Sequence, residues 1–357
     1  MKISQNIIVG SGFSAFILNK ILKKNYLVIT TDSKYTKSLP ERKNLTTHLK
    51  FFSKKFNSYG IYRYILKKSL LHDTLLHGGN TNLWGGICNI SKIKKYFNFL
   101  RKIIFFKRIS FNDTGSYSSN KYLFQMQKIG SNNGSIFNSS KNFKNLIKGH
   151  LVSFNIVQKN LICLKVKKKK TKNYFCKNLI LAVNTTQLID ILINSNIIKD
   201  KDQIFLREHK FKTKISLLPS TFKNRNVSLI LSYSLPGIVK HAVGTQKNFN
   251  KFMFRFLNFF PIFYHQIFYK KKIVARYIVE KKNLHIKEIF DKTDNKFGRS
   301  IHYFNMKINN INLGKKLKQT SKNIFGISSP FITNKAPGPI SNDLIEKAFE
   351  VSKKLNK

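Results

Sequence analysis

The stretch Ile3-Ser4-Gln5-Asn6-Ile7-Ile8-Val9-Gly10-Ser11-Gly12-Phe13-Ser14-Ala15 decides the fold of this chain. An apolar run ends at a glycine turn, and apolar residues at helical spacing follow over residues 15–22. A second apolar run, residues 26–30, leads to Thr31 and Asp32. The order strand, glycine turn, helix, strand predicts the beginning of a βαβ unit.

The turn between this strand and helix has the form G-x-G-x-x-A, from Gly10 through Gly12 to Ala15. In such a turn the first glycine permits the tight bend, and the second lets a pyrophosphate approach the helix N-terminus. The small third residue lets helix and strand pack closely. An acidic residue after the second strand would bind a ribose hydroxyl, and Asp32 is the nearest candidate, at slightly short spacing.

A second glycine-rich stretch reads His77-Gly78-Gly79-Asn80-Thr81-Asn82-Leu83-Trp84-Gly85-Gly86 and contains the only Trp of the sequence. Glycine pairs let the backbone adopt positive φ and lie flat against a ligand. The exposed N–H groups, with Asn and Thr side chains, can then bind a polar, planar cofactor. An ordinary tight loop has the same composition, so this interpretation depends on the rest of the chain.

The charge of the chain is extreme, because 66 Lys and Arg stand against 15 Asp and Glu in 357 residues, a formal net charge of +51. A polyanionic partner would explain this charge, and so would a compositional bias toward Lys. Lys residues are spread along the whole chain and no nucleic-acid-binding signature is present, which favours the second explanation. We therefore expect no specific nucleic acid partner, and contact with an anionic membrane surface remains an alternative.

The cysteine content and the early start of the first predicted strand favour a cytoplasmic protein. The three cysteines lack C-x-x-C spacing, so neither a disulfide framework nor a zinc site is indicated, and no metal site is expected. A strand from residue 3 leaves no room for a signal peptide. The most apolar stretch, residues 252–269, contains Arg255 and Pro261, which argue against a membrane span.

Further along, residues 116–141 are rich in Ser, Asn and Gly and are predicted to form a surface loop. Strands are predicted at 151–157, 161–166 and 178–183, and a helix at 187–197. A closing amphipathic helix is predicted at 341–355, with Ser341 as its N-cap.

Together these pieces resemble the glucose–methanol–choline (GMC) family of FAD-dependent oxidoreductases. The resemblance rests on separated motifs in the family's order: the Gly10–Ala15 turn, the 78–86 loop, the segment 178–192 and the segment 322–331. Asn184 stands where the family usually has Gly, and Ser328 stands at the usual Asp or Gly position.

The resemblance implies an α/β fold with a Rossmann-like FAD-binding domain and a second, substrate domain built from a β-sheet flanked by helices. The first would comprise residues 1–90, 151–200 and 301–357, and the second residues 91–150 and 201–300. The implied FAD-binding residues are Gly10, Gly12, Ala15, Asp32, Gly78, Gly79, Asn80, Thr81, Asn82, Trp84, Ser328 and Ser329.

In the family, a His removes the hydroxyl proton of an alcohol while the flavin takes a hydride from its carbon. His suits this work because its pKa lies near neutrality. His302 fits the family's position, with Asn305 where Gly is expected; a His that merely packs on a sheet face is the alternative. The second catalytic residue of the family maps to Gly338, which has no side chain to contribute, and His77 is a minor candidate for a covalent flavin link.

The resemblance thus implies an FAD-dependent oxidoreductase that acts on a CH–OH group of a sugar or other alcohol, with His302 as the base. The electron acceptor, other than NAD, is unknown. A catalytically degenerate relative that acts as a binding or assembly protein is the alternative, favoured by Gly338 and Asn184. A basic protein of nucleic acid or membrane surfaces is the third hypothesis, supported by charge alone.

Overall fold

The computed structural model describes part of the chain, and the fold and the candidate site are those of the described residues. The described residues are 3–22, 26–31, 61–66, 69–74, 77–82, 87–108, 126–130, 137, 139, 143, 145–158, 161–207, 212–216, 227–235, 238–245, 266–268, 275–289, 304–333 and 340–356.

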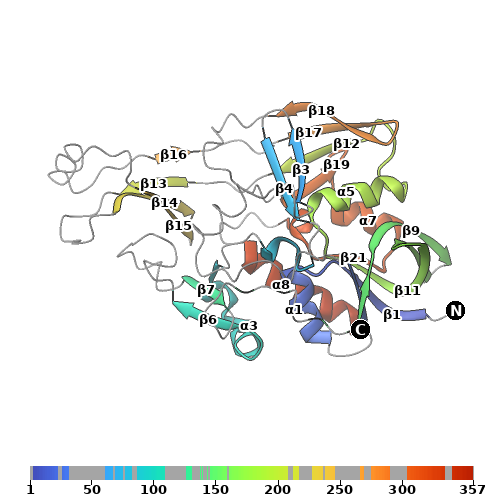
Figure 1. Ribbon diagram of the computed structural model, residues 1–357, viewed down its shortest axis with the longest axis horizontal. Coiled ribbons are helices and arrows are strands. Elements are labelled where there is room, and N and C mark those ends of the chain that lie inside the picture. Colours follow the sequence, from blue (N-terminus) through green and yellow to red (C-terminus); the bar gives the residue numbers. More distant parts are fainter. Residues whose placement is uncertain are drawn as a thin grey trace.

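A seven-stranded sheet forms the centre of the described structure (Figure 1). Its strands are β8 (Leu146–Lys148), β2 (Tyr26–Thr30), β1 (Ile3–Val9), β11 (Thr171–Leu181), β10 (Leu161–Lys167) and β9 (His150–Gln158), in that order, and β21 (Ile324–Gly326) also pairs with β11. β8, β2, β1, β11 and β21 run parallel to one another, whereas β10 pairs antiparallel with both of its neighbours, β11 and β9.

The long strand β11 joins the two parts of this sheet. Its first half pairs with β10, from Thr171 opposite Lys167, and its last residues pair with β21, from Leu179 opposite Ile324. The carboxyl ends of the parallel strands therefore meet at one edge of the sheet. Ligands of open α/β sheets bind outside this edge, where the connections leave in opposite directions.

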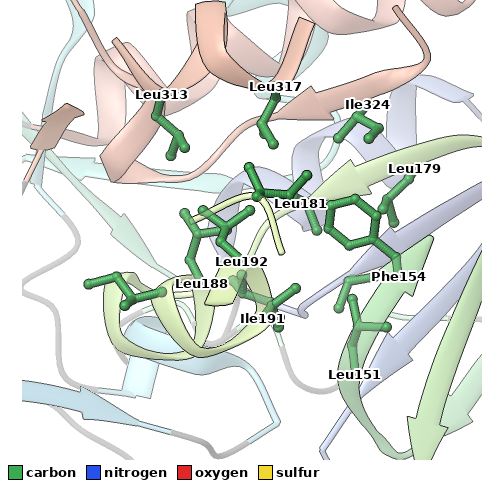
Figure 2. Close-up of a cluster of buried hydrophobic side chains, with 14 of the residues drawn as sticks. Leu151, Phe154, Leu179, Leu181, Leu188, Ile191, Leu192, Leu313, Leu317 and Ile324 are labelled. Carbon is green, nitrogen blue, oxygen red and sulfur yellow. The ribbon is translucent and has the colours of Figure 1, made fainter. Parts of the chain in front are cut away.

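Side chains alternate between two hydrophobic clusters, one on each face of the sheet. Ile8 and Ile180 face a cluster that includes α1 (Phe13–Leu22), α3 (Lys94–Leu100) and α8 (Ile340–Leu355). Their neighbours Ile7 and Leu181 face the other cluster, which includes β9 and β10, α5 (Thr185–Asn194) and α7 (Leu313–Thr320). Figure 2 shows this second cluster, where leucines of α5 and α7 gather around the end of β11.

The remaining strands form antiparallel sheets. One is a five-stranded sheet with the strand order β18 (Asn283–Ile289), β17 (Ala275–Glu280), β12 (Gln203–Arg207), β19 (Phe304–Ile308) and β20 (Ile311–Asn312). A four-stranded sheet contains β13 (Lys212–Ser216), β14 (Val227–Leu235), β15 (Ile238–Thr245) and β16 (Gln266–Phe268). A two-stranded sheet contains β3 (Ile61–Leu66) and β4 (Ser69–Thr74). A three-stranded sheet contains β5 (Ile87–Asn89), β6 (Phe105–Arg108) and β7 (Met126–Gly130). Short 3₁₀ turns are η2 (Gly79–Asn82), η3 (Ile90–Ile93) and η7 (Ser329–Phe331).

Several predicted boundaries are wrong, and the helix predicted at 187–197 is α5, which ends at Asn194. β11 begins at Thr171 rather than at 178, because its first residues are exposed and gain their structure from pairing with β10. α8 begins at Ile340, so Ser341 lies buried in its first turn and is not the N-cap. β8, from the segment 91–150 predicted for the substrate domain, pairs with β2 of the central sheet. The division into domains stays a prediction.

Among the described residues, no helix has both the length and the apolar character needed to cross a membrane.

Candidate cofactor site

The two glycines of the first turn have different surroundings. Gly10 has φ of +106°, and a Cβ placed there would lie 2.5 Å from the carbonyl oxygen of Ala182. The close passage of the chain after β11 therefore admits only glycine at this position. A Cβ placed at Gly12 would meet no atom of the described residues within 4 Å. Among these residues the space in front of Gly12 is open, as a bound phosphate would require.

Gly12 lies at the beginning of α1, and its carbonyl oxygen accepts the first helical hydrogen bond from Phe16 N–H at 3.0 Å. The first turn of an α-helix leaves N–H groups without intrahelical acceptors and carries a partial positive charge. An anion placed in the open space before Gly12 would be stabilised by both effects.

The second glycine-rich loop lies against this turn. Gly78 and Gly79 both have positive φ, at 93° and 52°. A Cβ at Gly79 would lie 3.6 Å from the Cα atom of Gly12. Two stretches separated by more than sixty residues thus bring backbone against backbone at the carboxyl edge of the sheet.

Ser11 connects the two glycine-rich stretches. Its Oγ accepts a hydrogen bond from Gly78 N–H at 2.8 Å and lies 2.7 Å from Thr30 Oγ1. His77 Nδ1 lies 2.9 Å from Ser11 Oγ and 3.3 Å from Thr30 Oγ1. Ser11 and Thr30 are buried, so this network forms away from water. This network fixes the loop to the ends of β1 and β2. His77 Nδ1 takes part in it through its contacts with Ser11 and Thr30.

Thr81 and Ser139 extend this network on the protein side of the loop through further hydrogen bonds. Thr81 Oγ1 donates to Gly78 O and lies 3.1 Å from Ser139 Oγ, which itself donates to Ser11 O. Both side chains are buried, with 2% of Thr81 and none of Ser139 exposed. The hydroxyl of Thr81 thus supports the loop, and the predicted contact of Thr81 with a cofactor stays a prediction. Ser139 was missed, because it stands in a Ser- and Asn-rich tract that predicts a surface loop.

Asn184, which departs from the family's usual Gly, has a structural role. Its Oδ1 accepts a hydrogen bond from Gln187 N–H at 2.9 Å, so it is the N-cap of α5. Its φ of −68° lies in a region that residues other than glycine readily adopt. Asn is among the preferred N-cap residues, and this departure is therefore explained by helix capping.

The segment after β21 brings Ser328 to the same edge. Ile327 N–H donates to Leu181 O at 3.0 Å, which continues the pairing of β21 with β11. The ring of Phe331 packs on Gly326, where a Cβ would overlap it, so the chain turns back on itself. Ser328 is 7% exposed, and its Oγ is buried without a hydrogen-bond partner among the described residues. Ser329 is half-buried beside it.

The other predicted site residues are placed only in part. Ala15 is fully buried in α1, as close helix packing requires. The backbones of Asn80 and Asn82 lie in η2, beside Gly79. The remaining predicted positions, Asp32, Trp84, His302 and Gly338, lie outside the described residues. The proposed base and the ribose contact therefore stay predictions.

These features fit a dinucleotide cofactor. The site combines an open helix N-terminus, two glycine backbones in contact and an unpartnered buried hydroxyl, all at the edge where cofactors of α/β sheets bind. The described residues contain no group of three His, Cys, Asp or Glu that could hold a metal ion.

No family model matches this sequence, and no curated protein matches it. Among solved structures, it is similar to pyridoxine 4-oxidase from Mesorbium loti, with a TM-score of 0.52 and 11% identity, over 98% of this chain and 99% of that chain.

Two further similar structures have a TM-score of 0.35 each. They are p-nitrophenol 4-monooxygenase PnpA from Pseudomonas putida DLL-E4 (8% identity, 99% of this chain and 79% of that chain) and RebC soaked with K252c (9% identity, 99% and 61%). The likeness to the oxidase concerns the fold. The predicted fold class is confirmed: the chain has a mixed α/β fold with a Rossmann-like parallel sheet.

Proposed function

We propose that this protein is an FAD-dependent oxidoreductase that binds its cofactor at the carboxyl edge of the central sheet. The observation that carries the proposal is the space before Gly12, which is open among the described residues, beside a loop where a Cβ placed at Gly79 would lie 3.6 Å from the Gly12 Cα atom. Bound FAD would supply a ring that accepts a hydride. The protein's own residues would hold and orient it.

The turn and the helix beside it would bind the pyrophosphate. Gly12 leaves room for it, and the N-terminus of α1 stabilises its charge. Ser11, through Gly78 N–H, keeps the second loop against the turn. Ser328 Oγ is free to hydrogen-bond the ligand, since it has no partner among the described residues. Asp32 would bind the ribose, as the spacing predicts.

The finer proposal is oxidation of a CH–OH group in a sugar or other alcohol, with an electron acceptor other than NAD. His302 would accept the hydroxyl proton as the hydride leaves the adjacent carbon. The family resemblance supports this reaction, and the fold likeness to an oxidase is compatible with it. Pyridoxine belongs among the alcohols to be tested, because the similar structure is named as its oxidase.

The alternative is a catalytically degenerate protein of the same fold that binds a partner instead of turning over an alcohol. Gly338 at the family's second catalytic position favours it. Asn184 no longer does, because it caps α5. Turnover of alcohols with an artificial electron acceptor separates the two functions.

The first experiment is the visible absorbance spectrum of the purified protein, before and after heat release of bound cofactor. We expect a flavin spectrum and released FAD. The matched variant is Gly12→Val, whose side chain fits the fold but occupies the space proposed for phosphate. It should fold normally and purify without flavin. A colourless wild-type protein that cannot be reloaded with FAD would overturn the proposal.

The second experiment measures oxidation of an alcohol panel by the FAD-loaded protein. We expect turnover of at least one sugar or small alcohol, and loss of most of this activity in His302→Ala with flavin still bound. An FAD-loaded wild type without activity toward any alcohol would favour the degenerate alternative.

A further inference from the structure

Asn305 has an unusual backbone conformation within a strand. It lies in β19 with φ of +59°, the left-handed region that Asn tolerates better than other non-glycine residues. Phe205 pairs with Lys307 and Arg207 with Phe304, so Asn305 and Met306 stand opposite Leu206 alone. This is a β-bulge, a feature that re-aims side chains and is frequent beside binding sites.

The side chain of Asn305 is buried without a partner for its oxygen. Asn305 is 7% exposed, and its Oδ1 has no hydrogen-bond partner among the described residues. Burial of an unpaired amide oxygen costs free energy, so it calls for an explanation. The left-handed Asn309 and Asn310 in the next turn differ, because both are exposed and Asn309 Oδ1 accepts from Gln203 N–H.

The position of this oxygen links it to the cofactor site. β19 packs against η7, which directly follows Ser328. Asn312 Oδ1 in β20 and Ser328 Oγ are also buried without partners among the described residues, and Ser328 lies just beyond the carboxyl end of β21. Of these, Asn305 and Ser328 belong to segments that lead to the β19–η7 contact, so a molecule bound beside Ser328 is the nearest candidate to supply a donor.

We propose that Asn305 is a further ligand-binding residue, whose Oδ1 accepts a hydrogen bond from a hydroxyl or N–H group of the molecule bound beside Ser328. The amide oxygen only accepts, so its partner must donate. Such donors exist on the ribityl chain and ring of FAD and on an alcohol substrate. This inference rests on the proposed function. The family resemblance expects glycine at position 305, so Asn305 would be a ligand contact that the resemblance does not imply.

The test is Asn305→Gly, which removes the amide while glycine adopts the same left-handed backbone without strain. The matched control is Asn310→Gly, which makes the same change at an exposed left-handed position two residues beyond β19. FAD and ADP are titrated into each apoprotein. If the cofactor is the donor, Asn305→Gly raises the Kd for FAD about tenfold and leaves that for ADP unchanged. Asn310→Gly changes neither.

An unchanged Kd for FAD with a several-fold higher KM for the best alcohol of the panel would also support the inference and identify the substrate as the donor. Asn305→Asp, which keeps an acceptor oxygen and tolerates the left-handed region, should restore most of the lost affinity. If Asn305→Gly leaves both the Kd and the KM as in the wild type, the inference is wrong although the proposed function stands. If the wild type itself binds no FAD, both are overturned.

Discussion

Two regions meet at the carboxyl edge of the central sheet, and they differ in how their polar groups are satisfied. Around the glycine turn, the hydroxyls of Ser11, Thr81 and Ser139 are buried and hydrogen-bonded within the protein. In the segments from β19 to η7, the side-chain oxygens of Asn305, Asn312 and Ser328 are buried without partners among the described residues. The first region is therefore complete on folding, and we propose that a ligand beside Ser328 and Asn305 completes the second.

This difference assigns separate tasks to the two regions. A preformed turn holds its shape whether or not a phosphate is present, so its residues contribute mainly to stability. Unpartnered buried oxygens cost folding free energy rather than adding to stability, and they keep their capacity for hydrogen bonds until a ligand arrives. Substitutions around the glycine turn should therefore mainly lower the free energy of unfolding, whereas substitutions of the unpartnered residues should mainly weaken ligand binding.

The largest effect is expected from Gly10→Ala. The new Cβ would lie 2.5 Å from Ala182 O at a φ of +106°, so steric overlap and backbone strain should lower the free energy of unfolding by about 3 kcal/mol or more. Urea denaturation measures this loss. Gly12→Ala is the matched control: with no atom within 4 Å of its Cβ, it should change stability by less than about 0.5 kcal/mol while weakening FAD binding. Equal losses at the two glycines would contradict the description of the turn.

An intermediate effect is expected from Ser11→Ala. This change leaves Gly78 N–H without its acceptor inside the protein, and a buried unpaired donor costs about 1–3 kcal/mol. Ser328→Ala is the comparison, because its Oγ has no partner among the described residues to lose. We expect it to leave the melting temperature of the apoprotein unchanged while it raises the Kd for FAD. A stability loss in Ser328→Ala equal to that in Ser11→Ala would remove the distinction between the two regions.

The smallest effect is expected from Asp190→Asn on α5, outside both regions. Burial raises the pKa of Asp190 to about 6. The folded state thus favours the protonated side chain, and its stability falls as pH rises from about 4 through 6, because the unfolded state ionises first. An uncharged Asn avoids this loss. The variant should match the wild type near pH 4 and exceed it by about 1 kcal/mol at pH 8, after allowance for solvent screening.

Thermal unfolding across this pH range checks the prediction, and FAD affinity should stay constant in Asp190→Asn. A variant with the same pH profile as the wild type would show that the buried carboxyl does not influence folding.

The order of strand, turn, helix and strand could be read from local periodicity. β1 and β2 have the predicted bounds, because β1 ends in the buried apolar residues Ile7–Val9 and β2 is a short run of mostly buried apolar residues. The beginning of β11 could not be predicted, since its first residues are exposed and become a strand only through β10. The role of Ser139 was equally hidden, because a serine that bonds Ser11 O from 128 positions away has no local signature.

The sequence by itself determined the βαβ beginning, the glycine turn and the candidates for cofactor binding. These depend on residue type and on spacings of a few residues, which act through local backbone sterics and periodic burial. The tertiary structure decided that Gly79 lies against Gly12, that Ser11 joins the two loops and that Asn305 and Ser328 keep unpartnered oxygens. Such features depend on which strands become neighbours, and that is set by packing the whole sheet between its two cores.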